Sequence, residues 1–122
     1  MRLDKLVKVA VSALDDIKGK DIQVLDVRKM TSLFDKIVLA SAESTRQAKA
    51  MASRVQEKTK EAGGKVYGVE GEQVGEWVLV DLGAVIVHIM QPAIRQHYNL
   101  EELWTHRPAR KRRAAAVPAA PE

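Results

Sequence analysis

The stretch EWVLVDLGAVIVHIM, residues 76–90, decides the fold, because it reads as two strands joined by a short turn. Its apolar and β-branched side chains favour extended backbone on either side of Leu82-Gly83. A two-residue connection that contains glycine is typical of a hairpin. With Leu82-Gly83 as the turn, the expected cross-strand pairs are Trp77 with His88, Leu79 with Ile86, and Asp81 with Ala84.

Both faces of this hairpin are largely apolar. Because side chains alternate between the two faces of a strand, one face is a uniform β-branched surface suited to a core. It consists of Val78, Val80, Val85 and Val87. The other face carries Trp77, Leu79, Ile86 and His88. Each face therefore needs cover, from a helix of the same chain or from a partner.

The flanking sequence supplies helices and further strands. Apolar residues at helical spacing predict an amphipathic helix over residues 3–17, packed on a sheet. Ser44 followed by Gln47 has the form of a capping box and predicts a second helix that ends at Gly63-Gly64, with Ala62 facing inward. The remaining predicted elements are strands at 22–27, 34–40 and 65–69 and a short helix at 92–98. We expect one α/β domain over residues 1–105, with the strand at 34–40 buried on both faces.

The net charge of +4 belongs to the C-terminal end of the chain. Residues 1–106 contain 15 basic and 15 acidic residues, and this neutral body argues against a large phosphate-binding face on the folded domain. Residues 106–122 form a basic, Ala/Pro-rich tail that we expect to be disordered. Its cations, Arg110, Lys111, Arg112 and Arg113, are either solvated or make nonspecific, salt-dependent contacts with RNA phosphates.

The rest of the composition is that of an ordinary globular protein. Hydrophobic residues make up 46% of the 122 residues, and no apolar run approaches the roughly 20 residues of a membrane span. The N-terminal segment lacks the apolar core of a signal sequence. With no cysteine, disulfides and thiol chemistry are excluded. We expect a soluble, cytoplasmic protein with no membrane contact.

Motifs that support catalysis are missing. The three histidines lie nine residues apart, a spacing that fits no metal motif, and there is no phosphate-binding glycine loop. Asp26 and Asp81, in predicted strands, are the best candidates for a magnesium pair. We expect ordinary strand-end roles for them, and hence no enzyme activity, no cofactor and no metal.

Trp77 is the strongest candidate for a binding residue. It lies beside an acidic, glycine-containing loop with Glu70, Glu72 and Glu76. An aromatic anchor with acidic neighbours suits a basic protein partner, and Tyr98 and Arg95 could complete its rim. The alternative is that Trp77 packs in the core of its own domain.

The segment GVEGEQVGEWVLVDLGAVIVHIMQPAIRQHYNLEELW, residues 68–104, resembles the ribosomal silencing factor (Iojap) family. Residues 21–52 are similar to the first half of the same family, so the resemblance covers about 80 residues. The features matched in the C-terminal half are Gly68, Glu70, Gly71, Trp77, Asp81, Gly83, Val87, His88, Arg95, Tyr98, Leu100, Glu101, Leu103 and Trp104. Ala42 departs from the family pattern, which more often has glycine there and could form a backbone anion site.

The resemblance implies a mixed central β-sheet flanked by helices, with a nucleotidyl transferase-like shape but without that active site. It also implies a translational repressor that binds ribosomal protein L-fourteen on the large ribosomal subunit. Binding there would block joining of the small subunit sterically, chiefly under nutrient limitation. A role in large-subunit maturation and a homodimer are further expectations. The partner-binding residues would be Trp77, Leu79, Asp81, Glu70, Glu72 and Tyr98.

Two rival functions remain at this point. The first is a small nucleotidyl transferase-like enzyme that uses Asp26 and Asp81 with magnesium. The second is a general RNA-binding assembly factor that works through its basic tail. Which face of the hairpin meets a partner is also left open.

Overall fold

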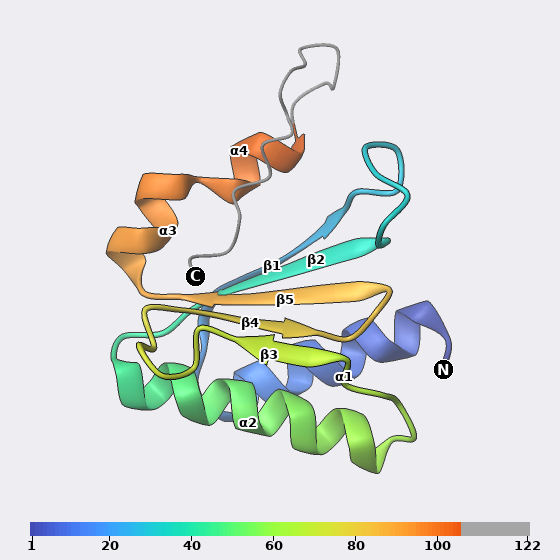
Figure 1. The fold of residues 1–122 in the computed structure, drawn as a ribbon, viewed down its shortest axis with the longest axis horizontal. Helices are drawn as coiled ribbons and strands as arrows, with labels where there is room; N and C mark the ends of the chain where they lie inside the picture. Colours follow the sequence, from blue (N-terminus) through green and yellow to red (C-terminus); the bar gives the residue numbers. More distant parts are fainter. Residues whose placement is uncertain (106–122) are drawn as a thin grey trace.

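The computed structural model describes residues 1–105, so the predicted tail at 106–122 lies outside the described residues. A five-stranded sheet separates two layers of helices (Figure 1). Helices α1 (Leu3–Asp16) and α2 (Thr45–Glu61) cover one face, and α3 (Pro92–Tyr98) and α4 (Leu100–Thr105) lie on the other. The predicted α/β domain with helices around a central sheet is therefore confirmed.

The sheet is mixed. Its strands are β1 (Lys20–Asp26), β2 (Lys36–Ser41), β3 (Gly68–Glu70), β4 (Trp77–Asp81) and β5 (Val85–Met90), in the spatial order β1-β2-β5-β4-β3. Only β2 and β5 pair in parallel, and the other neighbours are antiparallel. The β4–β5 hairpin thus joins the centre of the sheet to its β3 edge.

Two apolar clusters fill the spaces on either side of the sheet. The valines of β4 and β5 pack under α1 and α2, as the β-branched face predicted. The opposite cluster contains Trp77 and Met90 with Leu100 and Trp104 from α4. Strand β2 is buried on both faces, because Val38 and Ala40 belong to the first cluster and Ile37 and Leu39 to the second.

Helices α1 and α2 are tied together at one end by Gln47. Ser44 caps α2 by accepting a hydrogen bond from the Gln47 backbone N–H at 3.0 Å, which confirms the predicted cap. The Gln47 side chain donates to the carbonyls of Ile17 and Lys18 at 3.0 and 3.1 Å, where α1 ends. One side chain therefore fixes the start of α2 against the end of α1.

The predicted hairpin register was wrong by two residues. Trp77 pairs with Met90 and Leu79 pairs with His88, and the turn residues are Gly83-Ala84. The Asp81 carboxylate accepts a hydrogen bond from the Gly83 N–H at 2.8 Å, and Gly83 adopts a left-handed φ of +88°. Because a shift of two keeps the alternation of side chains, the two faces keep their predicted membership.

Two smaller predictions were also wrong. Strand β3 begins at Gly68 rather than at residue 65, since Gly68–Glu70 is the segment that pairs with β4. Ala62 is the C-cap of α2 and only half-buried, whereas Thr59 is the last fully buried residue of that helix. Within residues 1–105 no helix is both long and apolar enough to cross a membrane.

Thr59 offers a test of the packing under α2. Its Oγ1 is buried and has no hydrogen-bond partner among the described residues. Because an unsatisfied buried hydroxyl costs free energy, Thr59→Val should raise the free energy of unfolding by about 1 kcal/mol, measured by urea titration. Thr45→Val, which removes a hydroxyl that accepts a hydrogen bond from Gln91, is the control and should give no gain. A loss of stability in Thr59→Val would contradict this packing.

Candidate partner-binding site

The structure brings most of the predicted binding residues to one side of the sheet. Trp77, Leu79 and Asp81 alternate with inward valines along β4, so they share the face that carries α3 and α4. Glu70 is directly opposite Leu79 on the edge strand β3. Tyr98, at the end of α3, contacts Trp77. We call the accessible members of this group, Glu70, Leu79, Asp81 and Tyr98, the docking face.

Trp77 lies beneath this face rather than on it. Its indole is only 3% exposed, and it donates a hydrogen bond to Nδ1 of His88 at 2.9 Å. The Tyr98 ring sits over it with ring centroids 4.9 Å apart, and Tyr98 is 42% exposed. Tyr98 therefore presents the accessible aromatic ring, and Trp77 supports it from below. This burial agrees with the alternative that Trp77 packs in the core of its own domain, and a role for Trp77 in partner binding stays a prediction.

His88 is held neutral in this arrangement. Burial lowers its pKa from 6.5 to about 4, so the ring is uncharged near neutral pH. Since Nδ1 accepts the indole hydrogen bond, the neutral ring must carry its proton on Nε2. The hydrogen bond satisfies the indole N–H and Nδ1 of the imidazole within a buried layer.

The acidic loop between β3 and β4 is tightly held. Gly71 has a φ of +82°, and a Cβ at this position would lie 2.0 Å from the carbonyl oxygen of Trp77, so only glycine fits. Gln91 reaches the Gly75 carbonyl at 3.0 Å and anchors the far end of the loop. Glu72 is exposed on this loop, next to the docking face in the chain. The loop therefore presents its carboxylate from a fixed backbone.

The carboxylates of this region lack cationic partners. Within residues 1–105, no lysine or arginine forms an ion pair with Glu70, Glu72, Glu76 or Asp81. Most other acidic residues of the described chain are in ion pairs, such as Asp16 with Arg54 and Glu43 with Lys20. The β3–β4 edge is thus an uncompensated negative surface suited to a basic partner.

Arg95 is a buried clamp and not part of an exposed rim. It is 7% exposed, donates to Oγ of Ser41 at 2.8 Å, and forms a two-nitrogen contact with Glu101 at 2.9 Å. These bonds join β2, α3 and α4, and they hold Tyr98 over Trp77 through the position of α3. Sequence spacing could not reveal this clamp, because residues 41, 95 and 101 share no helical or strand period.

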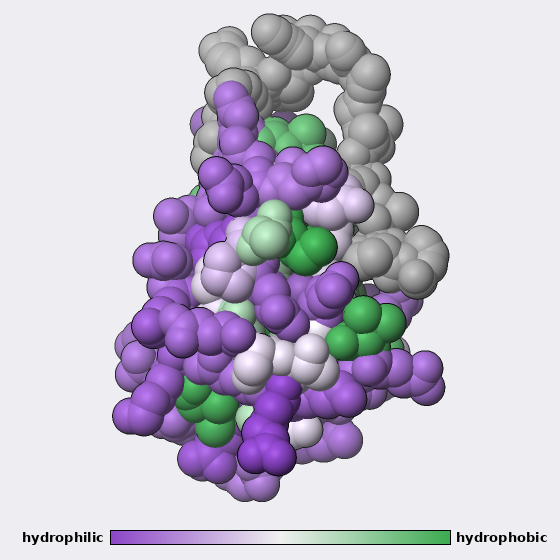
Figure 2. Space-filling view, turned by 90° about the vertical axis from the view of Figure 1, so that its left-hand side faces the viewer, coloured by the Kyte–Doolittle hydropathy of each residue, from purple (hydrophilic) through white to green (hydrophobic). Residues whose placement is uncertain are grey.

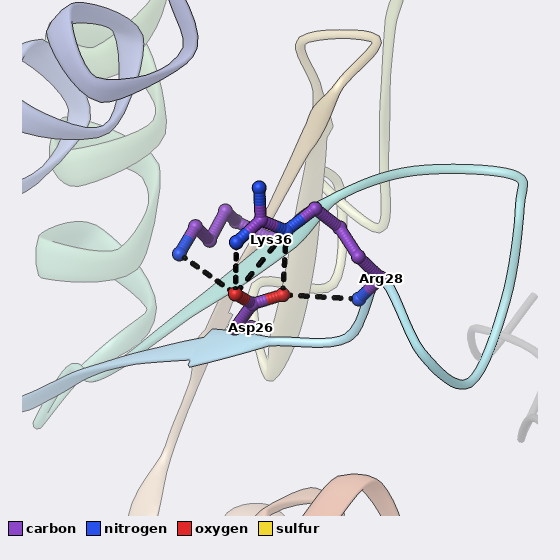
Figure 3. Close-up of polar contacts among 3 residues, drawn as sticks. All are labelled: Asp26, Arg28 and Lys36. Carbon is purple, nitrogen blue, oxygen red and sulfur yellow. Dashed lines mark hydrogen bonds and ion pairs between the residues drawn. The ribbon is translucent and has the colours of Figure 1, made fainter.

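Asp26 is already neutralised by two cations (Figure 3). The Nε of Arg28 lies 3.0 and 3.2 Å from its two carboxylate oxygens, and Lys36 Nζ lies at 3.4 Å. The Arg28 hydrogen bonds hold the pKa of Asp26 well below its usual range. Strands β2 and β5 separate Asp26 on β1 from Asp81 on β4, a distance of roughly 14 Å at about 4.8 Å per strand. The two aspartates cannot share one magnesium ion.

The surface around the acidic loop is mostly polar. Figure 2 shows the end of the molecule that carries this loop and the start of α3, and apolar side chains appear there only as small separate patches. A partner that approaches from this side would meet mainly charged and polar groups. In the part of the chain that is described, no three His, Asp or Glu side chains come together as a metal site.

Comparison with known proteins identifies similar chains. The family model described as "Ribosomal silencing factor during starvation" matches residues 1–121. The ribosomal silencing factor RsfS of Chromobacterium violaceum is 53% identical over 104 residues, which are 85% of this chain and 85% of that protein. The X-ray crystal structure of a protein from the same organism superposes with a TM-score of 0.85 at 49% identity, covering 97% of this chain and 98% of that one.

A more distant relative comes from mouse. It is named "Mitochondrial assembly of ribosomal large subunit protein 1" and is 32% identical over 104 residues. The match covers 83% of this chain and 46% of the mouse protein.

The Trp77–His88 pair predicts a pH dependence of stability. The pKa of His88 is about 4 in the folded protein and near 6.5 when unfolded, so the unfolded chain binds the extra proton first as pH falls. The stabilisation is present above pH 6.5 and is lost progressively toward pH 4. Between pH 7 and 5 the free energy of unfolding should fall by about 2 kcal/mol through this group.

His88→Gln is the control for this effect, because an amide oxygen can still accept the indole hydrogen bond but does not titrate. Urea titrations at pH 7 and 5 should show a smaller loss of stability in His88→Gln than in the unaltered protein. Equal losses in both proteins would contradict the assignment.

Proposed function

The chain belongs to the ribosomal silencing factor family, and from this premise we propose that it represses translation by binding the large ribosomal subunit. The bound protein blocks the small subunit from joining the large subunit, chiefly under nutrient limitation. The observation that carries the proposal is the docking face itself, where an exposed Tyr98 stands beside unpaired carboxylates on β3 and β4. Repression of this kind needs no reacting group, in keeping with a regulatory protein that is not an enzyme.

The proposed contact on the subunit is ribosomal protein L-fourteen. The docking face fits a basic protein, because its carboxylates are uncompensated within residues 1–105 and are held on an ordered strand edge. Tyr98 supplies rigid apolar area at the centre of the contact, and Leu79 extends it. Glu70, Glu72 and Asp81 meet basic side chains and set orientation and association rate.

Trp77 contributes to this contact indirectly. With only 3% of its surface exposed, it offers a partner little area of its own. Its hydrogen bond to His88 and its contact with Tyr98 fix the height and tilt of the tyrosine ring. The Arg95–Glu101 clamp holds α3 from the other side. The binding surface is therefore assembled before the partner arrives, which reduces the ordering cost of binding.

Repression then follows from occupancy alone. The fraction of large subunits that cannot join equals the fraction occupied, so the dissociation constant and the cellular concentration of the protein set the extent of silencing. Silencing is reversible, because no covalent bond forms. This proposal places the protein in the cytoplasm with the ribosomes.

Large-subunit maturation is a second candidate function. It is favoured by the mouse relative, whose name refers to assembly of the mitochondrial large subunit. The same docking face serves both functions, since a factor bound to a maturing subunit would also prevent its premature joining. A homodimer, suggested by the family resemblance, would have to leave this face free on at least one protomer.

Tyr98→Ala tests the docking face. Removal of a central aromatic contact should weaken binding to purified large subunits at least 30-fold, or about 2 kcal/mol, in a fluorescence titration. Tyr67→Ala is the control, since Tyr67 is also an exposed tyrosine, at 61% against 42% for Tyr98, and it precedes β3 and is not part of the docking face. The control should bind normally.

Trp77→Phe tests whether Trp77 acts by supporting the Tyr98 ring rather than by contacting the partner itself. The ring volume is largely kept, but the hydrogen bond to His88 is lost, so binding should weaken less than in Tyr98→Ala. If Tyr98→Ala binds as tightly as the unaltered protein while remaining folded, the docking face is misplaced.

A further inference from the structure

The charges of residues 1–105 sum to zero, but they are distributed unevenly between the two layers of the domain. Residues 1–20 and 43–65, which form α1, α2 and their flanks, contain 11 basic and six acidic residues, a net charge of +5. The remaining residues up to 105 contain four basic and nine acidic residues, a net charge of −5. Net neutrality of residues 1–106 is therefore weak evidence against a phosphate-binding face, because opposite charges on the two layers cancel in the sum.

The basic layer is a continuous structural unit. Helices α1 and α2 lie side by side on the sheet face opposite α3 and α4 (Figure 1). Gln47 joins the end of α1 to the start of α2, and at the other end the methyl group of Met1 approaches Gly64. The two helices are thus antiparallel, with their apolar sides buried in the sheet cluster and their outer sides exposed.

The outer sides of these helices carry cations that the domain itself does not use. Ion pairs within the layer engage Arg2, Lys20, Arg54 and Lys58. Seven exposed cations make no ion pair with any described residue: Lys5, Lys8, Lys18, Arg46, Lys49, Lys60 and Lys65. Among the acidic residues of the layer, only Asp15 is likewise without an ion pair in the described part of the chain.

We propose that the outer face of α1 and α2 binds the phosphate backbone of RNA. Arg46, Lys49 and Lys60 follow one exposed stripe of α2 at helical spacing, and they span roughly 21 Å at about 1.5 Å per residue. That length reaches several consecutive phosphates. Lys18 adds charge near the Arg46 end, and Lys5 and Lys8 lie on the neighbouring helix.

The chemistry of this face specifies backbone contact without base recognition. Residues 1–20 and 43–65 contain no Phe, Tyr or Trp, so the layer offers no ring on which a base could stack. Lysine and arginine side chains on an exposed helix contact phosphates in a sequence-independent, salt-dependent manner. The layer lies across the sheet from the docking face, so both can be occupied together. That the RNA is ribosomal RNA rests on the proposed function.

Paired substitutions test the RNA surface against a matched control. Arg46→Gln with Lys49→Gln removes two cations from the layer, and Arg28→Gln with Lys29→Gln removes two exposed cations from the β1–β2 loop outside it. Both pairs change the net charge equally. The probe is a fluorescently labelled 20-base-pair RNA duplex of arbitrary sequence. Each pair is made in the full chain and in a chain with Arg110, Lys111, Arg112 and Arg113 replaced by Gln.

The layer pair, Arg46→Gln with Lys49→Gln, should weaken binding of the RNA duplex about tenfold in low salt. It should also reduce the slope of log affinity against log salt concentration by about 2. The loop pair should leave both quantities nearly unchanged. Equal effects of the two pairs, or complete loss of binding on replacement of the four tail cations alone, would overturn the proposal. Binding of the layer pair to purified ribosomal protein L-fourteen should be normal, which separates this test from that of the docking face.

Discussion

The β4–β5 hairpin is apolar on both faces, and the rest of the structure is arranged to cover it. Valines on one face are buried by α1 and α2, whereas the other face holds Trp77 and Met90 beneath α3 and α4. The second face also contains the only buried histidine of the described chain, whose Nδ1 accepts the Trp77 hydrogen bond. Covering this face places Tyr98 over Trp77, so a packing requirement also builds the candidate binding surface.

The same division into layers separates charge. Carboxylates without ion-pair partners gather at the β3–β4 edge, and unpaired lysines and arginines gather on the outer sides of α1 and α2. A ribosomal subunit presents both basic protein and anionic RNA, so a polarised domain can orient itself before contact. The proposed docking to ribosomal protein L-fourteen and the proposed RNA contact use opposite ends of this charge distribution.

Much of the fold could be predicted from the sequence, because periodicity reports directly on burial. The valine face, the Ser44 cap and the doubly buried β2 all follow from local pattern. The hairpin register could not, since turns at Leu82-Gly83 and Gly83-Ala84 give the same faces, and the Asp81–Gly83 hydrogen bond favours the second. The burial of Trp77 depends on where α3 docks, and the Arg95 clamp joins distant segments. These are tertiary features that no local pattern encodes.

The central claim is that the protein prevents subunit joining by occupying the large subunit. Sucrose-gradient sedimentation of the purified protein with separated subunits tests it most directly. The protein should comigrate with large subunits, and added small subunits should form fewer joined ribosomes as its concentration rises, with Tyr98→Ala much less effective. Absence of comigration at low salt and micromolar protein, or normal joining despite full occupancy of large subunits, would contradict the account.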